Sequence, residues 1–285
     1  MNENSVELDQ VIPKPSRASI IKRYLKLLAT IAIGFFLLST ISVVFYRFVP
    51  VPYTPLMFWK STVSLVTGPE TLGINKKWVP ITEINPSIQR AVIRAEDAKF
   101  YIHHGFDIEA IQAAMKYNKT HKKQKGASTI SQQTAKNVFL WPSRSWIRKG
   151  MEVYFTVMIE ALWSKQRILE VYLNVIELGP GVYGVEAAAE KYFHKKAKGL
   201  SNRESSLMAA VLPNPIKFKI NKPSAYILRR QRKIMGGGSI ITVAPKVEET
   251  KEFLDIKLDD EDENQAAPNE KGAADTNTEA APSNN

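Results

Sequence analysis

The longest apolar run of the chain lies near its start. Residues 27–46 read LLATIAIGFFLLSTISVVFY and contain no charged side chain. At ~1.5 Å rise per residue, a helix of this length matches the ~30 Å hydrocarbon core of a bilayer. A cleavable signal peptide has a shorter apolar region of ~7–15 residues followed by small residues, whereas this run ends in Tyr46-Arg47-Phe48. The pattern therefore predicts an uncleaved transmembrane anchor rather than a signal peptide or a buried helix.

The residues on either side of the anchor predict its orientation. Residues 1–26 carry the basic side chains Lys14, Arg17, Lys22, Arg23 and Lys26. Because basic residues stay on the cytoplasmic side, we expect residues 1–26 to form a cytoplasmic tail. Residues 47–236 then form a domain on the outer, periplasmic face of the membrane. Residues 50–59, PVPYTPLMFW, carry aromatic side chains that favour the membrane interface.

From about residue 80 to residue 234 the apolar positions follow a helical period. Asn85-Pro86 predicts a helix start, because Asn caps a helix and Pro fits its first turn. Thr129-x-x-Gln132 is a capping box that starts a second helix. Further helices are predicted over residues 147–163, 166–174, 185–193 and 204–212, the last clear one. Strand signals are weak and limited to residues 78–81 and 239–243, while residues 177–184 are typical of a turn-rich loop.

Charge divides the chain into two parts. The 285 residues include 39 Lys or Arg and 28 Asp or Glu, a formal net charge of +11. Twelve acidic and three basic residues follow Val247, so residues 1–247 carry a net charge of +20. Residues 237–285 are polar and acidic, which predicts a disordered tail. A basic domain suits a membrane surface or a phosphorylated substrate, and its expected place outside the cytoplasm excludes nucleic acid.

The first stretch with candidate chemistry is residues 96–107, EDAKFYIHHGFD. Glu96 follows Ile88 and Val92 at helical spacing, so it extends an apolar stripe and is partly removed from water. Such a carboxylate suits a general base, and the alternative is an acid at a solvated helix end. A zinc site needs three or four ligands, and the chain has four His and no Cys. His103 is therefore expected to form hydrogen bonds rather than to bind a metal.

Two further stretches carry polar groups on predicted helices. Residues 126–133, GASTISQQ, put a glycine and hydroxyl groups at a helix start, which can bind phosphate; the alternative is a plain helix cap beside a basic loop. In Arg148-Lys149-Gly150-Met151-Glu152, the acid shares a helix face with Thr156 and Glu160. This polar seam predicts a groove wall, and the alternative is a surface pair between Arg148 and Glu152.

Together these stretches resemble the peptidoglycan glycosyltransferases, which polymerise lipid II into glycan strands. The matches are Glu-Asp-x-x-Phe-x-x-His-x-Gly at 96–105, Gly-x-Ser-Thr-Ile-x-Gln-Gln at 126–133 with Lys136-Asn137, Arg-Lys-x-x-Glu at 148–152 and Ile-Leu-Glu-x-Tyr-Leu-Asn at 168–174. The resemblance covers roughly residues 50–235, and Ser131 stands where the family often has Thr. It implies a mainly α fold with a lysozyme-like helical lobe and a smaller membrane-associated lobe, preceded by one transmembrane helix.

The resemblance also implies roles for individual residues. Glu96 matches the base that takes the proton from the 4-hydroxyl of the acceptor sugar, and polyprenyl pyrophosphate leaves with inversion. Glu152 matches a second catalytic acid, which either positions groups or holds a divalent cation such as Mg²⁺ or Mn²⁺. The implied substrate-binding residues are Asp97, Phe100, His103, Ser128, Thr129, Gln132, Gln133, Lys136, Asn137, Arg144, Arg148 and Lys149.

Many members of that family carry a transpeptidase domain with a Ser-x-x-Lys motif. Here the only match is Ser19–Lys22, before the anchor, so we expect a monofunctional enzyme. The expected partners are lipid II, the growing glycan chain and membrane lipid, with other cell-wall synthesis and division proteins as further candidates. Two alternatives stay open: a lytic transglycosylase or muramidase, and a non-enzymatic cell-wall scaffold. The bases Lys136, Arg144 and Arg148 favour synthesis, and the acid pair Glu96 and Glu152 argues against a scaffold.

Overall fold

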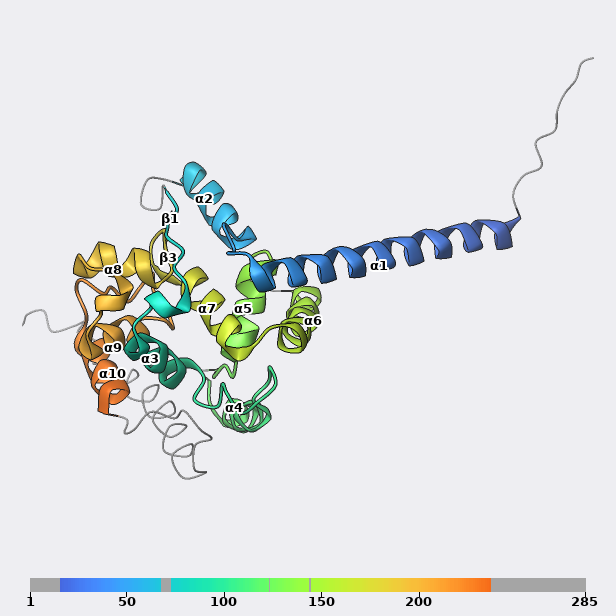
Figure 1. Ribbon diagram of the computed structural model, residues 1–285. Coiled ribbons are helices and arrows are strands. Elements are labelled where there is room, and N and C mark those ends of the chain that lie inside the picture. The colour runs from blue at the N-terminus through green and yellow to red at the C-terminus, as the bar shows by residue number, and fades with distance from the viewer. Residues whose placement is uncertain (1–15, 68–72, 123, 144, 237–285) are drawn as a thin grey trace, which may run out of the picture.

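Helices make up most of the computed structural model, which describes residues 16–67, 73–122, 124–143 and 145–236 (Figure 1). The helices are α1 (Arg17–Phe48), α2 (Pro55–Thr67), α3 (Pro86–Glu96), α4 (Ile108–Thr120), α5 (Ile130–Phe139), α6 (Trp146–Leu162), α7 (Lys165–Val175), α8 (Val185–Phe193), α9 (Asn202–Ala210) and α10 (Ala225–Gly236). The strands are β1 (Asn75–Lys76), β2 (Glu177–Gly179) and β3 (Val182–Tyr183), and short 3₁₀ turns lie at Ile81–Glu83 and Ala197–Gly199. The predicted mainly α class is confirmed.

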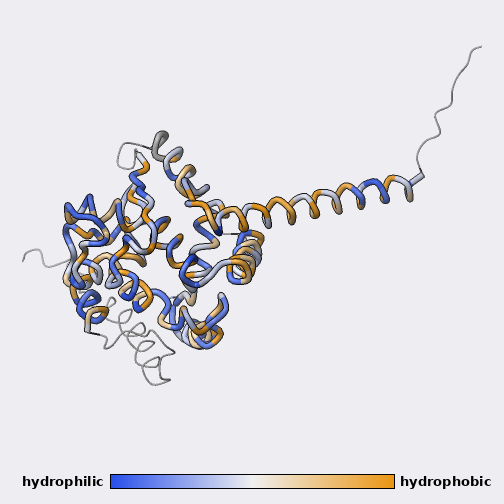
Figure 2. The backbone as a smooth tube through the Cα atoms, viewed as in Figure 1, coloured by the Kyte–Doolittle hydropathy of each residue, from blue (hydrophilic) through white to orange (hydrophobic). Residues whose placement is uncertain are grey.

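Helix α1 extends away from the other elements along most of its length (Figure 1). It is longer than the predicted anchor 27–46, and it is long and apolar enough to cross a membrane. Figure 2 shows hydrophobic residues along the part nearer the domain and hydrophilic residues nearer its free end. Arg17, Lys22, Arg23 and Lys26 belong to the same helix as the apolar run.

The carboxyl end of α1 is bound to the domain by polar contacts with α6 and α7. Ser39 Oγ and the Tyr154 hydroxyl lie 2.7 Å apart, and Trp163 Nε1 donates to the Val43 carbonyl at 2.8 Å. The guanidinium of Arg167 donates to the Tyr46 carbonyl at 2.8 Å and to the carbonyl of Val49, which follows the helix, at 2.6 Å. These contacts fix the direction in which α1 leaves the domain.

Local signals fix where several helices begin. Asn85 caps α3, with Pro86 at its first position, and Thr129 and Gln132 form both bonds of the predicted capping box at α5. The four helices predicted from periodicity correspond to α6, α7, α8 and α9 within two residues at each end.

The strand predicted at residues 78–81 was wrong. Residues 78–81 are not a strand, and residues 177–184, expected to be a loop, contain β2 and β3. The sheet has the order β1-β3-β2, with β1 parallel to β3 and β2 antiparallel to it. The second predicted strand, 239–243, and the predicted disordered tail, 237–285, lie outside the described residues.

Three helices of the described residues were not predicted from the sequence, namely α2, α4 and α10. Residues 204–212 were predicted as the last clear helix, but α10 follows α9 in the chain and packs against it. The apolar core passes through α7, whose Ile168, Leu169, Tyr172 and Leu173 are fully buried. Helix α5 packs against α6 and α7, while α3 packs against α9 and α10. The end of α3 and the start of α5 meet between these two groups of helices, and the candidate site lies there.

Candidate active site

Glu96 is the last residue of α3, and its side chain is 14 % exposed. Ile88 and Val92, which precede it on the same stripe, are fully buried, as the spacing predicts. The Glu96 carboxylate accepts a hydrogen bond from Gln133 Nε2 at 2.9 Å, and an Arg230 guanidinium nitrogen lies 3.9 Å from its other oxygen. The carboxylate is thus partly removed from water but keeps a neutral donor and a positive charge beside it.

The amide of Gln133 is held in one orientation by Tyr172. The Tyr172 hydroxyl donates to Gln133 Oε1 at 3.1 Å, so the amide nitrogen must face Glu96. Burial raises the pKa of Tyr172 well above its usual value, and the charges of Glu96 and Asp97 raise this pKa further. Tyr172 therefore keeps its hydroxyl proton and acts as the donor. The hydrogen bonds run from Tyr172 to Gln133 and from Gln133 to Glu96.

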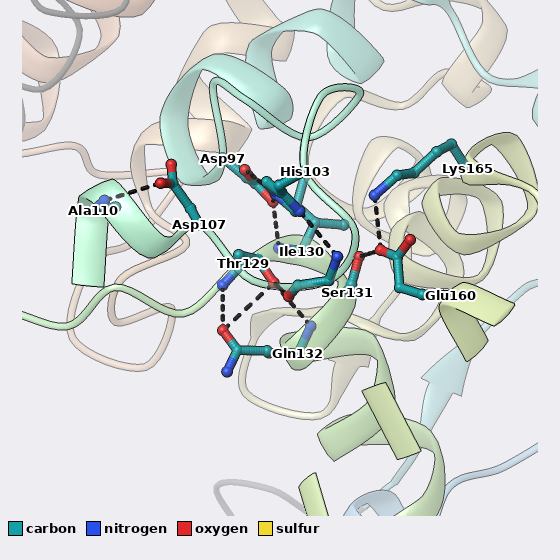
Figure 3. A network of polar contacts seen from close by, with 11 residues as sticks. Asp97, His103, Asp107, Ala110, Thr129, Ile130, Ser131, Gln132, Glu160 and Lys165 are labelled. Carbon is teal, nitrogen blue, oxygen red and sulfur yellow. Dashed lines mark hydrogen bonds and ion pairs between the residues drawn. The ribbon is translucent and has the colours of Figure 1, made fainter. Parts of the chain in front are cut away.

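Asp97 occupies the amino end of α5 (Figure 3). Its Oδ2 accepts the Ile130 backbone N–H at 2.9 Å, and His103 Nε2 lies 2.9 Å from Oδ1. Because His103 Nδ1 accepts the Gly105 N–H at 3.1 Å, the ring proton is on Nε2 and is donated to Asp97. His103 is thus a hydrogen-bonding residue, as expected.

The contacts at residues 126–133 favour the plain helix cap over the phosphate-binding interpretation. The Ile130 N–H is taken by Asp97, and the Gln132 N–H donates to Thr129 Oγ1 at 3.2 Å. The Thr129 hydroxyl in turn donates to the Gly105 carbonyl at 2.7 Å. A negative side chain of the protein itself already occupies the positive end of the helix, which is the arrangement of a plain helix cap.

Glu152 is 3 % exposed, so the pair with Arg148 is not a surface pair. Arg148 Nη1 donates to one of its oxygens at 3.2 Å and Lys149 Nζ to the other at 2.6 Å. A divalent cation at this carboxylate would have to displace two cationic side chains, so the residues present do not fit one here. Among the described residues, no three His, Asp or Glu side chains are grouped as metal ligands would be.

A cleft of about 540 Å³ opens beside these residues. One wall carries Gln133, Lys136, Asn137 and Arg148, which were all predicted as binding residues. The cleft is also lined by residues that the prediction did not include, among them Lys60, Glu177, Leu212 and Pro215.

Lys136 is a partly buried cation of the cleft lining. Burial lowers its pKa, the charge of Glu152 opposes this change, and the charges of Arg148 and Lys149 add to it. Lys60, which also lines the cleft, forms an ion pair with Glu177. The cleft therefore gathers cations from α2, α5 and α6 around one space, which suits an anionic group.

Not every predicted binding residue reaches this cleft. Phe100 is fully buried, and Thr129 and Gln132 are buried within the helix cap. These three residues therefore do not line the cleft but pack beneath it. Ser128 is exposed outside the cleft lining. The prediction for Arg144 concerns a residue outside the described part of the chain.

The prediction missed Arg230, Lys60 and Glu177. Arg230 lies in the basic run Arg229-Arg230-Gln231-Arg232-Lys233, which has no motif spacing that marks one member as buried. Lys60 and Glu177 meet only because α2 folds over the small sheet. In the folded protein the largely buried side chains of Arg230 and Glu177 mark them as exceptions, because charged residues are rarely buried unless they are paired.

A partly desolvated carboxylate next to a cationic cleft is typical of enzymes that transfer a group from a charged leaving group. A family model described as Transglycosylase matches residues 67–237, and the chain belongs to this transglycosylase family.

Curated relatives share the name biosynthetic peptidoglycan transglycosylase. The relative from Bdellovibrio bacteriovorus is 58 % identical over 234 residues, which cover 81 % of this chain and 92 % of the relative. The relative from Pasteurella multocida is 53 % identical, covering 73 % of this chain and 85 % of the relative. The relative from Bacteroides thetaiotaomicron is 49 % identical, with 80 % and 92 % covered.

Replacing Asp97 by Asn tests the contact at the start of α5. An Asn side chain has one acceptor oxygen, so its NH₂ group would face either the Ile130 N–H or the His103 Nε2–H. We expect the free energy of unfolding to fall by about 1–3 kcal/mol, the cost of an unsatisfied buried donor, measured by thermal and denaturant unfolding.

The control is Asp107→Asn. Asp107 caps α4 by accepting the Ala110 N–H at 2.9 Å, and α4 contains no buried residue. Asn caps helices as well as Asp does, so this variant should keep its stability. Equal losses in the two variants would contradict the assigned role of Asp97.

Proposed function

We propose that the protein is a peptidoglycan glycosyltransferase that polymerises lipid II into glycan strands and releases polyprenyl pyrophosphate. The observation that carries this proposal is the position of the Glu96 carboxylate, partly desolvated and held by Gln133, next to a cleft lined by Lys60, Lys136 and Arg148. The name of the relatives and the matched family support the same activity.

In this proposal Glu96 is the general base. It accepts the proton of the acceptor sugar's 4-hydroxyl while that oxygen forms a bond to the anomeric carbon of the growing chain. The bond from this carbon to the pyrophosphate breaks, and its electron pair leaves with the pyrophosphate. Lys136 and Arg148 stabilise the charge that develops on the leaving group, an electrostatic contribution that depends on fixed donors.

We assign Glu152 a positioning role. Its carboxylate holds Arg148 and Lys149 at 3.2 and 2.6 Å, and its charge opposes the loss of the Lys136 proton. A buried acid among three bases keeps these cations in place without needing a metal ion. We therefore do not assign Glu152 as a ligand of Mg²⁺ or Mn²⁺.

The lytic alternative uses a similar carboxylate but releases no pyrophosphate, so it gives no reason for the buried Lys136 and Arg148. A non-enzymatic scaffold gives no reason for the fixed contact between Gln133 and Glu96. The partners that follow from the proposal are lipid II, the glycan chain and membrane lipid; other cell-wall synthesis and division proteins remain candidates from the sequence resemblance alone.

Replacing Glu96 by Gln tests the base. The amide keeps the acceptor oxygen for Gln133 but cannot take a proton, so kcat with lipid II should fall by ~10²–10⁴-fold. Glu109→Gln, on the exposed face of α4, is the control and should keep the rate. Separating the products by size also tests the lytic alternative, because synthesis gives material longer than lipid II. A Glu96→Gln variant that polymerises normally would exclude this residue as the base.

The lowered pKa of Lys136 predicts a pH dependence. Burial lets this amine lose its proton at a lower pH than an ordinary lysine, and the neutral amine no longer stabilises the leaving pyrophosphate. The rate should therefore decrease on the alkaline side. Lys136→Ala should lower kcat by ~10²–10³-fold at neutral pH.

Lys136→Arg separates charge from shape. Arginine stays protonated throughout this range, so the alkaline decrease should move to higher pH even if the absolute rate is lower. Lys222→Ala, in an exposed loop, is the control for general loss of positive charge. An unchanged alkaline decrease in Lys136→Arg would assign it to another group.

We also propose that the amino terminus lies in the cytoplasm and the domain on the periplasmic face of the membrane. The support is the basic residues before the apolar part of α1. A reporter that is active only outside the cytoplasm, fused after Asn285, should give signal, whereas a reporter that needs the cytoplasm should not. The reverse result would invert the orientation.

A further inference from the structure

A buried acid outside the cleft joins three elements behind the candidate base. The Glu160 side chain, in α6, is 8 % exposed. Its Oε1 accepts a hydrogen bond from the Ser131 hydroxyl of α5 and another, at 2.7 Å, from the Lys165 ammonium at the start of α7 (Figure 3). Ser131 is fully buried and Lys165 is mostly buried. None of these three residues is part of the cleft lining, so the proposed reaction gives them no role so far.

Glu160 also supports the loop that follows Glu96. Gly105, in this loop, has φ +92°, and a Cβ added there would lie 2.9 Å from Thr156 Cγ2 and 3.1 Å from Glu160 Cγ. The loop backbone therefore lies directly on α6. The Lys165 ammonium lies 4.7 Å from the centre of the Phe100 ring, which belongs to the same loop.

The Glu160 cluster contacts two segments that are also next to Glu96: helix α5, which carries Gln133, and the loop that follows Glu96. Ser131 lies two residues before Gln133 in α5, and Gln133 donates to Glu96 at 2.9 Å. The loop that rests on Glu160 begins directly after Glu96. A shift of α5 relative to α6 would therefore change the distance between the Gln133 amide and the Glu96 carboxylate. Hydrogen bonds to a charged group are the stronger kind, and a buried, paired acid has few alternative positions.

We propose that Glu160, together with Ser131 and Lys165, is a positioning group for the reaction, because it fixes α5 so that Gln133 orients the Glu96 carboxylate. This inference depends on the proposed function. It assigns Glu160 no contact with substrate. Its loss should therefore lower kcat and leave KM nearly unchanged, since the cations of the cleft are not touched.

The test replaces the link that connects α5 to Glu160. Ser131→Ala removes the hydroxyl but leaves the ion pair between Glu160 and Lys165 in place, so the variant should fold. A misplacement of reacting groups by ~1 Å can cost ~10²-fold, so we expect kcat to fall by about 10–100-fold with little change in KM. Ser131→Thr keeps the hydroxyl and should restore kcat.

Ser205→Ala is the matched control. Ser205 is another fully buried helical hydroxyl, bonded to Ser87 at 2.6 Å, in a different part of the domain. Both Ala variants lose one buried hydrogen bond and should show similar decreases in melting temperature, but only Ser131→Ala should lose kcat. Equal kcat values in the two variants, a rise in KM instead of a fall in kcat, or no restoration by Ser131→Thr would overturn the proposal.

The parent protein in the same assay separates the two proposals. If it elongates lipid II and Ser131→Ala does so equally well, only the positioning role is wrong. If the parent protein forms no polymer from lipid II, both the function and the inference are wrong.

Discussion

The Asp97 carboxylate joins the end of α3 to the start of α5, and the candidate site depends on this contact. The carboxylate accepts the Ile130 N–H and the proton of His103, and a negative charge is favourable at the amino end of a helix. With α5 fixed at its first residue, Gln133 faces Glu96 one turn further on. Lys136 and Asn137 follow three and four residues later, on the same side of the helix, and line the cleft.

The sequence was sufficient to predict helices that begin with local capping signals. It was insufficient where the structure depends on contacts between segments far apart in the chain. The cap at Asn85 and the capping box at Thr129 act within a few residues, and the structure contains both. The pairing of β1 with β3 joins residues 75 and 182, so no local pattern could predict it. Helix α4 has no buried residue, and α10 buries Arg230 and Gln231 together with Ile227 and Ile234, so tertiary packing rather than residue type decides what these helices bury.

The same distinction applies to the site. Glu96 could be found because it continues an apolar stripe, which is a property of one helix. The partners of the site could not be found in this way. Arg230 of α10 lies beside Glu96 of α3, and Lys60 of α2 pairs with Glu177 of β2. The orientation of Gln133 depends on Tyr172, and only packing shows which end of the amide faces the carboxylate. The sequence identifies Glu96 as a candidate, but tertiary contacts determine its electrostatic environment.

The contacts of Ser39, Val43 and Arg167 at the end of α1 have a mechanical consequence. Because helix and domain are joined by hydrogen bonds rather than by a free linker, they should move as one body. A transmembrane helix responds to bilayer thickness by changing its tilt. Such a tilt would rotate the cleft relative to the lipid surface by the same angle. The thickness of the surrounding membrane would then be a variable that acts on the access of a lipid-linked substrate to Glu96.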